Sequence, residues 1–135
     1  MKIIRTVNLI PFNKDKTQIC LVKRVSTDVN NGKWSFPGES IQDGESMNQA
    51  MIRIIANQMS CSVYDIIEFK KTEKKVKISV VKSQYVLGSI EGNIKLDERK
   101  YSDFKWVDFD STLMSYDYAF AEKNIVTNLL NKFEK

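Results

Sequence analysis

Two apolar, β-prone runs occupy the N-terminal part of the chain, at residues 6–12 and 17–25. The gap between them, residues 13–16, is polar, and two strand-like runs joined by a short polar gap are typical of a β-hairpin. A Trp-Ser-Phe run at 34–36 predicts another short strand, because the Pro-Gly pair that follows it tends to end regular structure.

Helical spacing of the apolar residues begins after Ser46. Apolar residues recur there at three- and four-residue steps, which places them on one face of a helix; they are Ala50, Met51, Ile54, Ile55 and Met59. Ser46 is a suitable N-cap, and Gln49, three residues later, completes a capping box. The pattern predicts a helix that opens at Ser46 and runs to about residue 59.

The second half of the chain again shows strands followed by a helix. Residues 66–69 and 76–87 are expected to form strands, 93–96 is a candidate for a further short one, and 104–107 is expected to be a buried strand. A final helix is predicted from an N-cap at Asp117 through residue 132, with apolar residues at helical spacing: Ala121, Ile125 and Leu129. This order predicts an α/β fold in which a mixed β-sheet lies between two helices.

Length and composition favour one ordinary globular domain, residues 1–135, with 42% hydrophobic and 28% charged residues. No apolar run approaches the roughly 20 residues of a membrane span, and the N-terminus lacks the features of a secretory signal. Cys20 and Cys61 have neither metal-ligand nor redox spacing. We expect both to be reduced core residues of a cytoplasmic protein that has no membrane partner.

The charge pattern leaves two explanations open. A net charge of +4 suits an anionic ligand such as a nucleotide, but scattered lysines also serve solubility. The densest basic cluster straddles an expected hairpin turn and consists of Lys70, Lys71, Lys74, Lys75 and Lys77. Single-stranded nucleic acid needs aromatic residues interleaved with basic ones, and here only Phe69 and Tyr85 flank the cluster, so a nucleic-acid partner is not expected. Histidine is absent, which excludes a histidine base, a Ser-His triad and a His-ligated zinc.

Several motifs then occur at the spacing of a known signature. A Trp-Ser-Phe-Pro-Gly run at 34–38 is followed by a Gly-Glu-Ser turn at 44–46 and by Arg53. In this register Glu39 stands at the glycine of the Nudix box and Glu45 at its first glutamate, and the box ends near residue 63. An acidic-aromatic-basic-Trp-Val run at 103–107, preceded by Glu98, matches a later family segment. The chain resembles the Nudix hydrolase superfamily (MutT-like) over nearly its whole length.

The resemblance implies a Nudix-type α/β/α sandwich and a Mg-dependent pyrophosphohydrolase that acts on nucleoside diphosphates linked to another moiety. In that family three glutamates of the box helix hold divalent cations, and the corresponding residues here are Ile54, Asn57 and Gln58. These positions share one helix face. Carboxamides carry no charge and Ile54 has no ligand atom, so this helix face offers a hard cation no anionic oxygen ligand. We expect hydrolysis to be weak or lost, and a catalytically silent nucleotide sensor or regulatory protein is the alternative.

The resemblance also assigns candidate site residues. The catalytic candidates are Glu45, Arg53 and Glu98, and the substrate-binding candidates are Arg24, Gly38 and Glu39. No metal ligand is expected at the family positions, although Glu39, Glu45 and Glu98 are candidate substitutes if Mg or Mn arrives on substrate phosphates. The alternatives are that Glu45 and Arg53 only maintain the scaffold and that Asp97 and Glu98 form a solvated turn. Many family members form homodimers, and a homodimer is compatible with the resemblance.

Overall fold

The computed structural model describes residues 1–133. Its elements in chain order are β1 (Lys2–Phe12), β2 (Gln18–Arg24), β3 (Trp34–Ser35), β4 (Gly38–Ser40), α1 (Met47–Met59), β5 (Ser62–Val76), β6 (Ser79–Glu91), β7 (Tyr101–Asp108), the 3-10 helix η1 (Ser111–Ser115) and α2 (Glu122–Phe133). Among the described residues, no helix is long and apolar enough to span a membrane.

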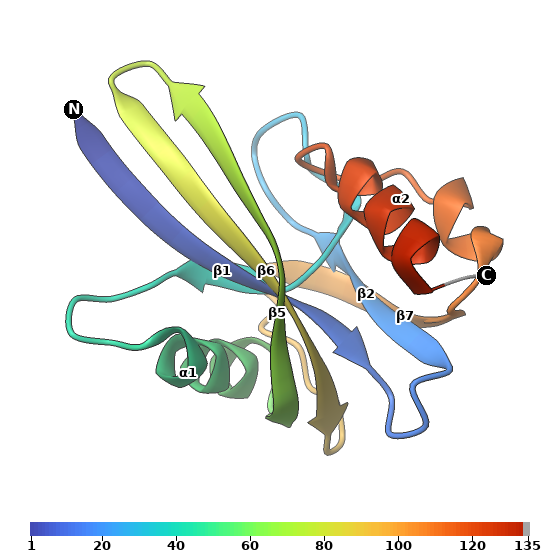
Figure 1. The fold of residues 1–135 in the computed structure, drawn as a ribbon. Helices are drawn as coiled ribbons and strands as arrows, with labels where there is room; N and C mark the ends of the chain where they lie inside the picture. The colour runs from blue at the N-terminus through green and yellow to red at the C-terminus, as the bar shows by residue number, and fades with distance from the viewer. Residues whose placement is uncertain (134–135) are drawn as a thin grey trace.

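One mixed sheet forms the middle of the molecule, with α1 and α2 on its two sides (Figure 1). The strand order is β3-β2-β1-β6-β5, while β4 pairs with β1 and β7 pairs with β2. Strands β1 and β6 run parallel, and the other pairs are antiparallel. The predicted α/β/α sandwich with a mixed sheet between two helices is therefore confirmed.

Each helix covers its own hydrophobic core. Met51, Ile54 and Ile55 of α1 are fully buried against one face of the sheet, together with both cysteines, which are free thiols as expected. On the opposite face the core is formed under α2, with Leu129 fully buried. The predicted N-cap of α1 is also confirmed, because the Ser46 side chain accepts from the Gln49 backbone amide in a complete capping box.

The first predicted hairpin forms, but its strands separate at once. Asn13 closes the turn by accepting hydrogen bonds from the backbone amides of Thr17 and Gln18. Beyond it, β1 and β2 pair only at Phe12 and Ile19, because β1 continues along β6 and β2 along β7. A strand also follows Pro37, where the end of regular structure was expected: β4 pairs with β1 beside Gly38, whose missing side chain leaves room for Asn8.

The prediction for the central strands was wrong in its boundaries. Strand β5 begins at Ser62 and continues to Val76, so the basic cluster lies mostly within a strand, and the turn to β6 is at Lys77 and Ile78. Residues 93–96 form no strand; the backbone amide of Lys95 donates instead to the Met59 carbonyl at the end of α1.

The predicted start of the last helix was also wrong. Asp117 is not its N-cap, since its carbonyl accepts from the Trp34 amide and the helix begins only at Glu122. Ala119 donates to the Trp34 carbonyl, so residues 117–119 pair with β3 before the chain turns into α2. The short helix η1 was not expected.

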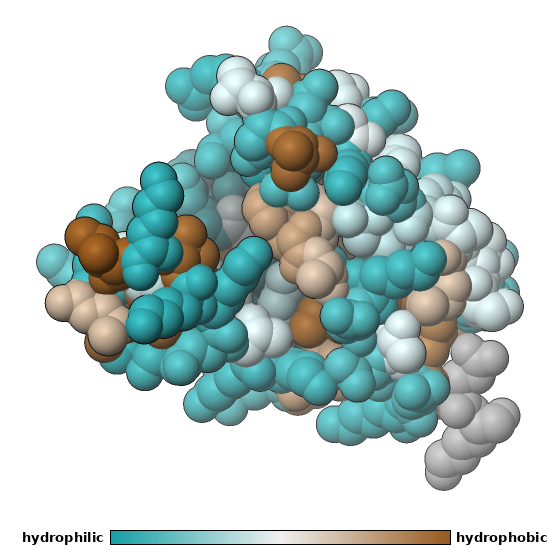
Figure 2. All heavy atoms as spheres, turned by 90° about the horizontal axis from the view of Figure 1, so that it is seen from above, coloured by the Kyte–Doolittle hydropathy of each residue, from teal (hydrophilic) through white to brown (hydrophobic). Residues whose placement is uncertain are grey.

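Three strands project beyond the two helices. The start of β1, the end of β5 and the start of β6 extend together away from the body of the molecule (Figure 1). Seen from above, this projection carries exposed apolar side chains within a mostly hydrophilic surface (Figure 2), and Met1, Ile3 and Ile78 are among the exposed apolar residues. The projection also forms one wall of a cavity.

Candidate functional site

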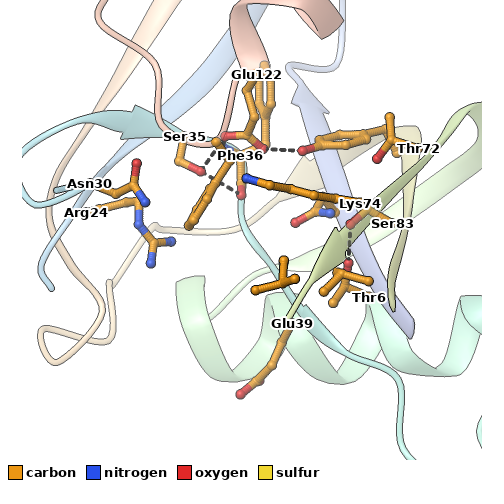
Figure 3. Close-up of a pocket in the computed structure, with 16 residues that line it drawn as sticks. Thr6, Arg24, Asn30, Ser35, Phe36, Glu39, Thr72, Lys74, Ser83 and Glu122 are labelled. Atoms are coloured by element: carbon orange, nitrogen blue, oxygen red, sulfur yellow. Dashed lines mark hydrogen bonds between the residues drawn. The ribbon is translucent and has the colours of Figure 1, made fainter. Parts of the chain in front are cut away.

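A cavity of about 480 Å³ lies between the projecting strands and the segment that leads into α2. It is lined by residues from seven elements and three loops, all drawn as sticks in Figure 3: Thr6, Asn8, Arg24, Asn30, Ser35, Phe36, Gly38, Glu39, Thr72, Lys74, Val76, Val81, Ser83, Tyr85, Phe120 and Glu122. Its size falls within the roughly 300–1,000 Å³ of small-molecule sites. Polar and apolar groups are mixed along the walls, as expected for a ligand that combines a ring with charged groups.

A buried carboxyl group forms one side of the cavity. Glu122 is only 1% exposed. One of its oxygens accepts from the Ser35 hydroxyl at 2.6 Å and from the Phe36 amide at 3.4 Å, and the other accepts from the Tyr85 hydroxyl at 2.7 Å. Burial raises the pKa of Glu122 to about 7, although these hydrogen bonds and the charge of Arg24 oppose the rise. The carboxyl therefore titrates near neutral pH.

The backbone before α2 explains how Glu122 reaches this place. Phe120 and Ala121 both have positive φ values, 55° and 60°, a conformation that non-glycine residues adopt rarely. The two residues turn the chain sharply after it pairs with β3, so that the first residue of α2 faces the sheet. Phe120, which is 53% exposed, lines the cavity.

Two cationic side chains line the same cavity. The Arg24 guanidinium lies 4.5 Å from the centre of the Phe120 ring, within the range of a cation–π contact. Its Nε is buried and has no hydrogen-bond partner among the described residues. Lys74 extends from β5 into the cavity (Figure 3).

Arg53 is the centre of an ion-pair network outside this cavity. It binds Glu45 through two nitrogens, at 2.7 and 3.0 Å, and donates to the Ser40 carbonyl at 3.1 Å. The hydrogen bond from Arg53 is the main cause that holds the pKa of Glu45 below its usual range. Glu39 lies 3.7 Å from Arg53 and 3.5 Å from Lys100. The network ties the loop before α1 to β4 and to the helix.

The face of α1 that resembles the metal-binding face offers few free ligand atoms. Ile54 is fully buried and Asn57 is exposed. Gln58 is 1% exposed, and both ends of its amide are used: the nitrogen donates to the Gly38 carbonyl at 3.1 Å and the oxygen accepts from the Tyr101 hydroxyl at 2.8 Å. Ile54 lies in the core, as its place on the apolar face of the predicted helix indicated, and Gln58 is a buried structural residue.

Glu98 lies in an exposed turn close to the end of α1. The backbone amide of Asp97 donates to the Gln58 carbonyl, which anchors the turn on the helix. Asp97 itself pairs with Arg99 at 3.1 Å. Within residues 1–133, no three or more Cys, Asp or Glu side chains converge in a way that could hold a metal ion, so Glu39, Glu45 and Glu98 do not form a joint ligand set.

The structure divides the sequence-predicted site residues into two groups. Arg24, Gly38 and Glu39 line the cavity, while the catalytic candidates Glu45, Arg53 and Glu98 do not. Four further cavity residues were not predicted from the sequence: Glu122, Tyr85, Ser35 and Phe120. Lys74 was identified only as one of five clustered lysines. Thr72, Lys74 and Val76 are spaced two residues apart and line the cavity from one face of the strand, and this spacing could have distinguished Lys74 from its neighbours.

The sequence also matches a known protein family. A family model described as the NUDIX domain matches residues 2–129. The chain belongs to the Nudix family. No curated protein sequence matches it significantly.

Several solved structures share the fold over nearly the whole chain. A MutT structure from work on Aliivibrio salmonicida and Vibrio cholerae has a TM-score of 0.80 at 26% identity and covers 98% of this chain and 100% of its own. The Escherichia coli ORF135 protein has a TM-score of 0.83 at 18% identity, over 97% and 91% of the two chains. The Nudix domain of Shewanella oneidensis NrtR, solved with ADP-ribose, has a TM-score of 0.75 at 20% identity, over 98% and 89%.

Nudix hydrolases generally use a divalent metal such as Mg or Mn, and the residues of this chain do not fit a metal held by the box helix. A hard cation requires several oxygen ligands, mostly carboxylates. At the family positions the chain provides a buried isoleucine, one exposed carboxamide, and one carboxamide whose oxygen already accepts a hydrogen bond.

Proposed function

We propose that this Nudix domain binds a nucleoside diphosphate linked to another moiety and hydrolyses it weakly or not at all. The observation that carries the proposal is the contrast between two regions. The cavity is large, is lined by polar groups and contains two cationic side chains, Arg24 and Lys74. The box helix, in contrast, has Ile54 and Gln58 packed into the protein where the family holds metal.

The proposal assigns Arg24, Gly38 and Glu39 to the substrate-binding cavity and leaves Glu45 and Arg53 with a scaffold role. Glu45 is held by Arg53 in two hydrogen bonds and accepts a third from the Gln42 amide. A carboxylate in this arrangement has little capacity left for a metal or for a proton. A silent nucleotide sensor or regulatory protein is the function that follows, with a homodimer compatible but not required.

Residual hydrolysis is the second candidate, and the position of Glu98 favours it. The Glu98 carboxylate is exposed and lies in a turn anchored to the last turn of the box helix. A Mg or Mn ion carried by substrate phosphates would then need only this one additional carboxylate from the protein.

The test is a joint binding and turnover screen. The purified protein is incubated with NDP-sugars, ADP-ribose, dinucleoside polyphosphates and NTPs in Mg²⁺ and in Mn²⁺, and both thermal stability and phosphate release are recorded. The likeness to a Nudix domain solved with ADP-ribose makes that compound a good first ligand. A ligand present at about a hundredfold its Kd stabilises the native state by about 3 kcal/mol, a rise in Tm on the order of 10 °C.

Stabilisation without turnover is the expected result. Turnover that disappears in Glu98→Gln but persists in Glu91→Gln, another exposed glutamate, would establish the hydrolase candidate instead. If no compound of the panel raises Tm, the nucleotide-binding proposal is wrong.

A further inference from the structure

The cavity is lined by two cationic and two acidic side chains, but the acidic ones neutralise little of the positive charge. Its two carboxyl groups belong to Glu39 and Glu122. Glu39 is occupied by Arg53 and Lys100, and its carboxylate points away from the cavity (Figure 3). Glu122 is buried and titrates near neutral pH, so much of its negative charge is absent there. Neither carboxylate forms an ion pair with the two cations of the cavity among residues 1–133.

Lys74 reaches the cavity because of its place on β5. Side chains alternate between the two faces of a strand, and Thr72, Lys74 and Val76 line the cavity from the same face. Lys75 therefore points to the opposite face and is absent from the cavity lining. The Lys74 amine extends toward the side of the cavity formed by Ser35 and Phe36 (Figure 3), and Lys74 forms no ion pair in the described part of the chain.

Arg24 carries a donor that lacks an acceptor. Its Nε is buried without a hydrogen bond in the described structure, while its guanidinium is held against Phe120. An unpaired buried donor is costly, and a ligand that brings an acceptor relieves that cost. Guanidinium groups pair with phosphate oxygens through two parallel hydrogen bonds, and an ammonium group binds phosphate as a point charge.

We propose that Lys74 and Arg24 take the place of the divalent cation and bind the diphosphate of the ligand directly, so that binding needs no metal. This inference rests on the proposed function, since it concerns how the same cavity holds a nucleoside diphosphate. Together, the two unit positive charges of Lys74 and Arg24 equal the charge of one divalent cation. Their position on β5 and β2, away from α1, explains why the box helix can lose its carboxylates while the cavity keeps its ligand.

The effect of Mg²⁺ on affinity distinguishes binding through a bridging metal from direct binding by Lys74 and Arg24. Inorganic pyrophosphate is the probe, because it contains the diphosphate common to the whole ligand class, and its affinity is measured by calorimetry in EDTA and in Mg²⁺. A site that relies on a bridging metal binds more tightly when Mg²⁺ is added. A site that relies on Lys74 and Arg24 binds in EDTA and more weakly in Mg²⁺, because the ion neutralises the anion in solution.

A pair of variants on one strand supplies the second readout. Lys74→Gln is expected to weaken pyrophosphate binding in EDTA about tenfold, the effect of one charge-assisted contact, and to flatten the dependence of affinity on salt. Lys75→Gln removes the same charge from the adjacent residue. It is expected to leave the affinity for pyrophosphate and its salt dependence unchanged.

Binding that requires Mg²⁺, or equal weakening in Lys74→Gln and Lys75→Gln, would overturn the inference. Neither result would affect the proposed function, which fails only if no nucleotide of the screening panel stabilises the protein.

Discussion

Gln58 stands where a Nudix hydrolase has a metal-binding glutamate, and its amide is fully engaged inside the protein. The nitrogen donates to the Gly38 carbonyl and the oxygen accepts from Tyr101. A carboxylate could replace only the second of these bonds, because it has no proton to donate to Gly38. The substitution from glutamate to glutamine thus changes a residue that binds cations into one that joins β4, α1 and β7.

Restoring the family residue should consequently harm the protein. Gln58→Glu is expected to lower the free energy of unfolding by about 2 kcal/mol at neutral pH, since it places a buried carboxylate against an unpaired carbonyl. The loss should shrink in acid, where a protonated carboxyl can donate to Gly38. Urea unfolding at both pH values measures it.

Asn57→Glu is the matched control, because it restores another family glutamate at an exposed position. It is expected to change stability by no more than about 0.5 kcal/mol. Equal effects of the two substitutions would show that the Gln58 hydrogen bonds contribute little.

The core position of Ile54 was predictable from the sequence, whereas the contacts of Gln58 were not, because its partners lie far away along the chain. The burial of Ile54 follows from its place in a local helical pattern. The partners of Gln58 are 20 and 43 residues away, and no local pattern encodes them. Glu122 was missed for the same reason, because Ser35 and Tyr85 are 87 and 37 residues from it. 

At the scale of elements, α1 ends in a conformation that its sequence does not favour. Ser60 stands at the second, terminal glycine of the Nudix box. It has a φ of 58° and a ψ of 32°, which is left-handed geometry that glycine adopts freely. Ser60→Gly is expected to raise the free energy of unfolding by about 1 kcal/mol, as measured by urea denaturation.

Ser62→Gly makes the same chemical change two residues later, at the start of β5, where φ is not positive. Here glycine is expected to destabilise by about 0.5–1 kcal/mol, because it adds entropy to the unfolded chain without relieving strain. If both variants shift stability in the same direction, backbone conformation does not explain the effect at Ser60.

The elements themselves were predictable to different degrees. Helix α1 has a capping box and one apolar face, and both are visible in a single stretch of sequence. Strand β5 has exposed residues on both faces over 70–76, so it lacks the alternation that marks a half-buried strand. The start of α2 depends on the pairing of residues 117–119 with Trp34, which overrides the preference of Asp117 for an N-cap position.

At the scale of the whole molecule, the cavity exists because three distant regions meet. The projecting strands provide Lys74, the turn into α2 provides Phe120 and the first helical residue, Glu122, and the end of β2 provides Arg24. Only the last of these was among the residues expected from the family resemblance. The sheet brings the walls together, while several residues that line them lie in segments whose structure depends on tertiary contacts.

The Glu122 carboxyl makes the stability of the whole protein depend on pH. Its pKa is raised from 4.5 in a free side chain to about 7 in the native state, so between these values the native state retains a proton that the unfolded chain has lost. The free energy of unfolding should therefore fall as pH rises through this window, by on the order of 3 kcal/mol in total, and then level off. Carboxyls with lowered pKa, such as Glu45 and Asp97, act in the opposite direction but at lower pH.

Glu122→Gln isolates this contribution, because an amide oxygen can still accept from Ser35 and carries no charge at any pH. Urea denaturation between about pH 5 and pH 8 should show a declining curve for the wild type and a flatter one for the variant. The chain has no histidine, so few other side chains titrate in this range. Glu68→Gln, at an exposed position, should keep the wild-type slope. Parallel curves for the wild type and Glu122→Gln would mean that the buried carboxyl is ionised throughout, and the cavity would then carry one more negative charge than its geometry indicates.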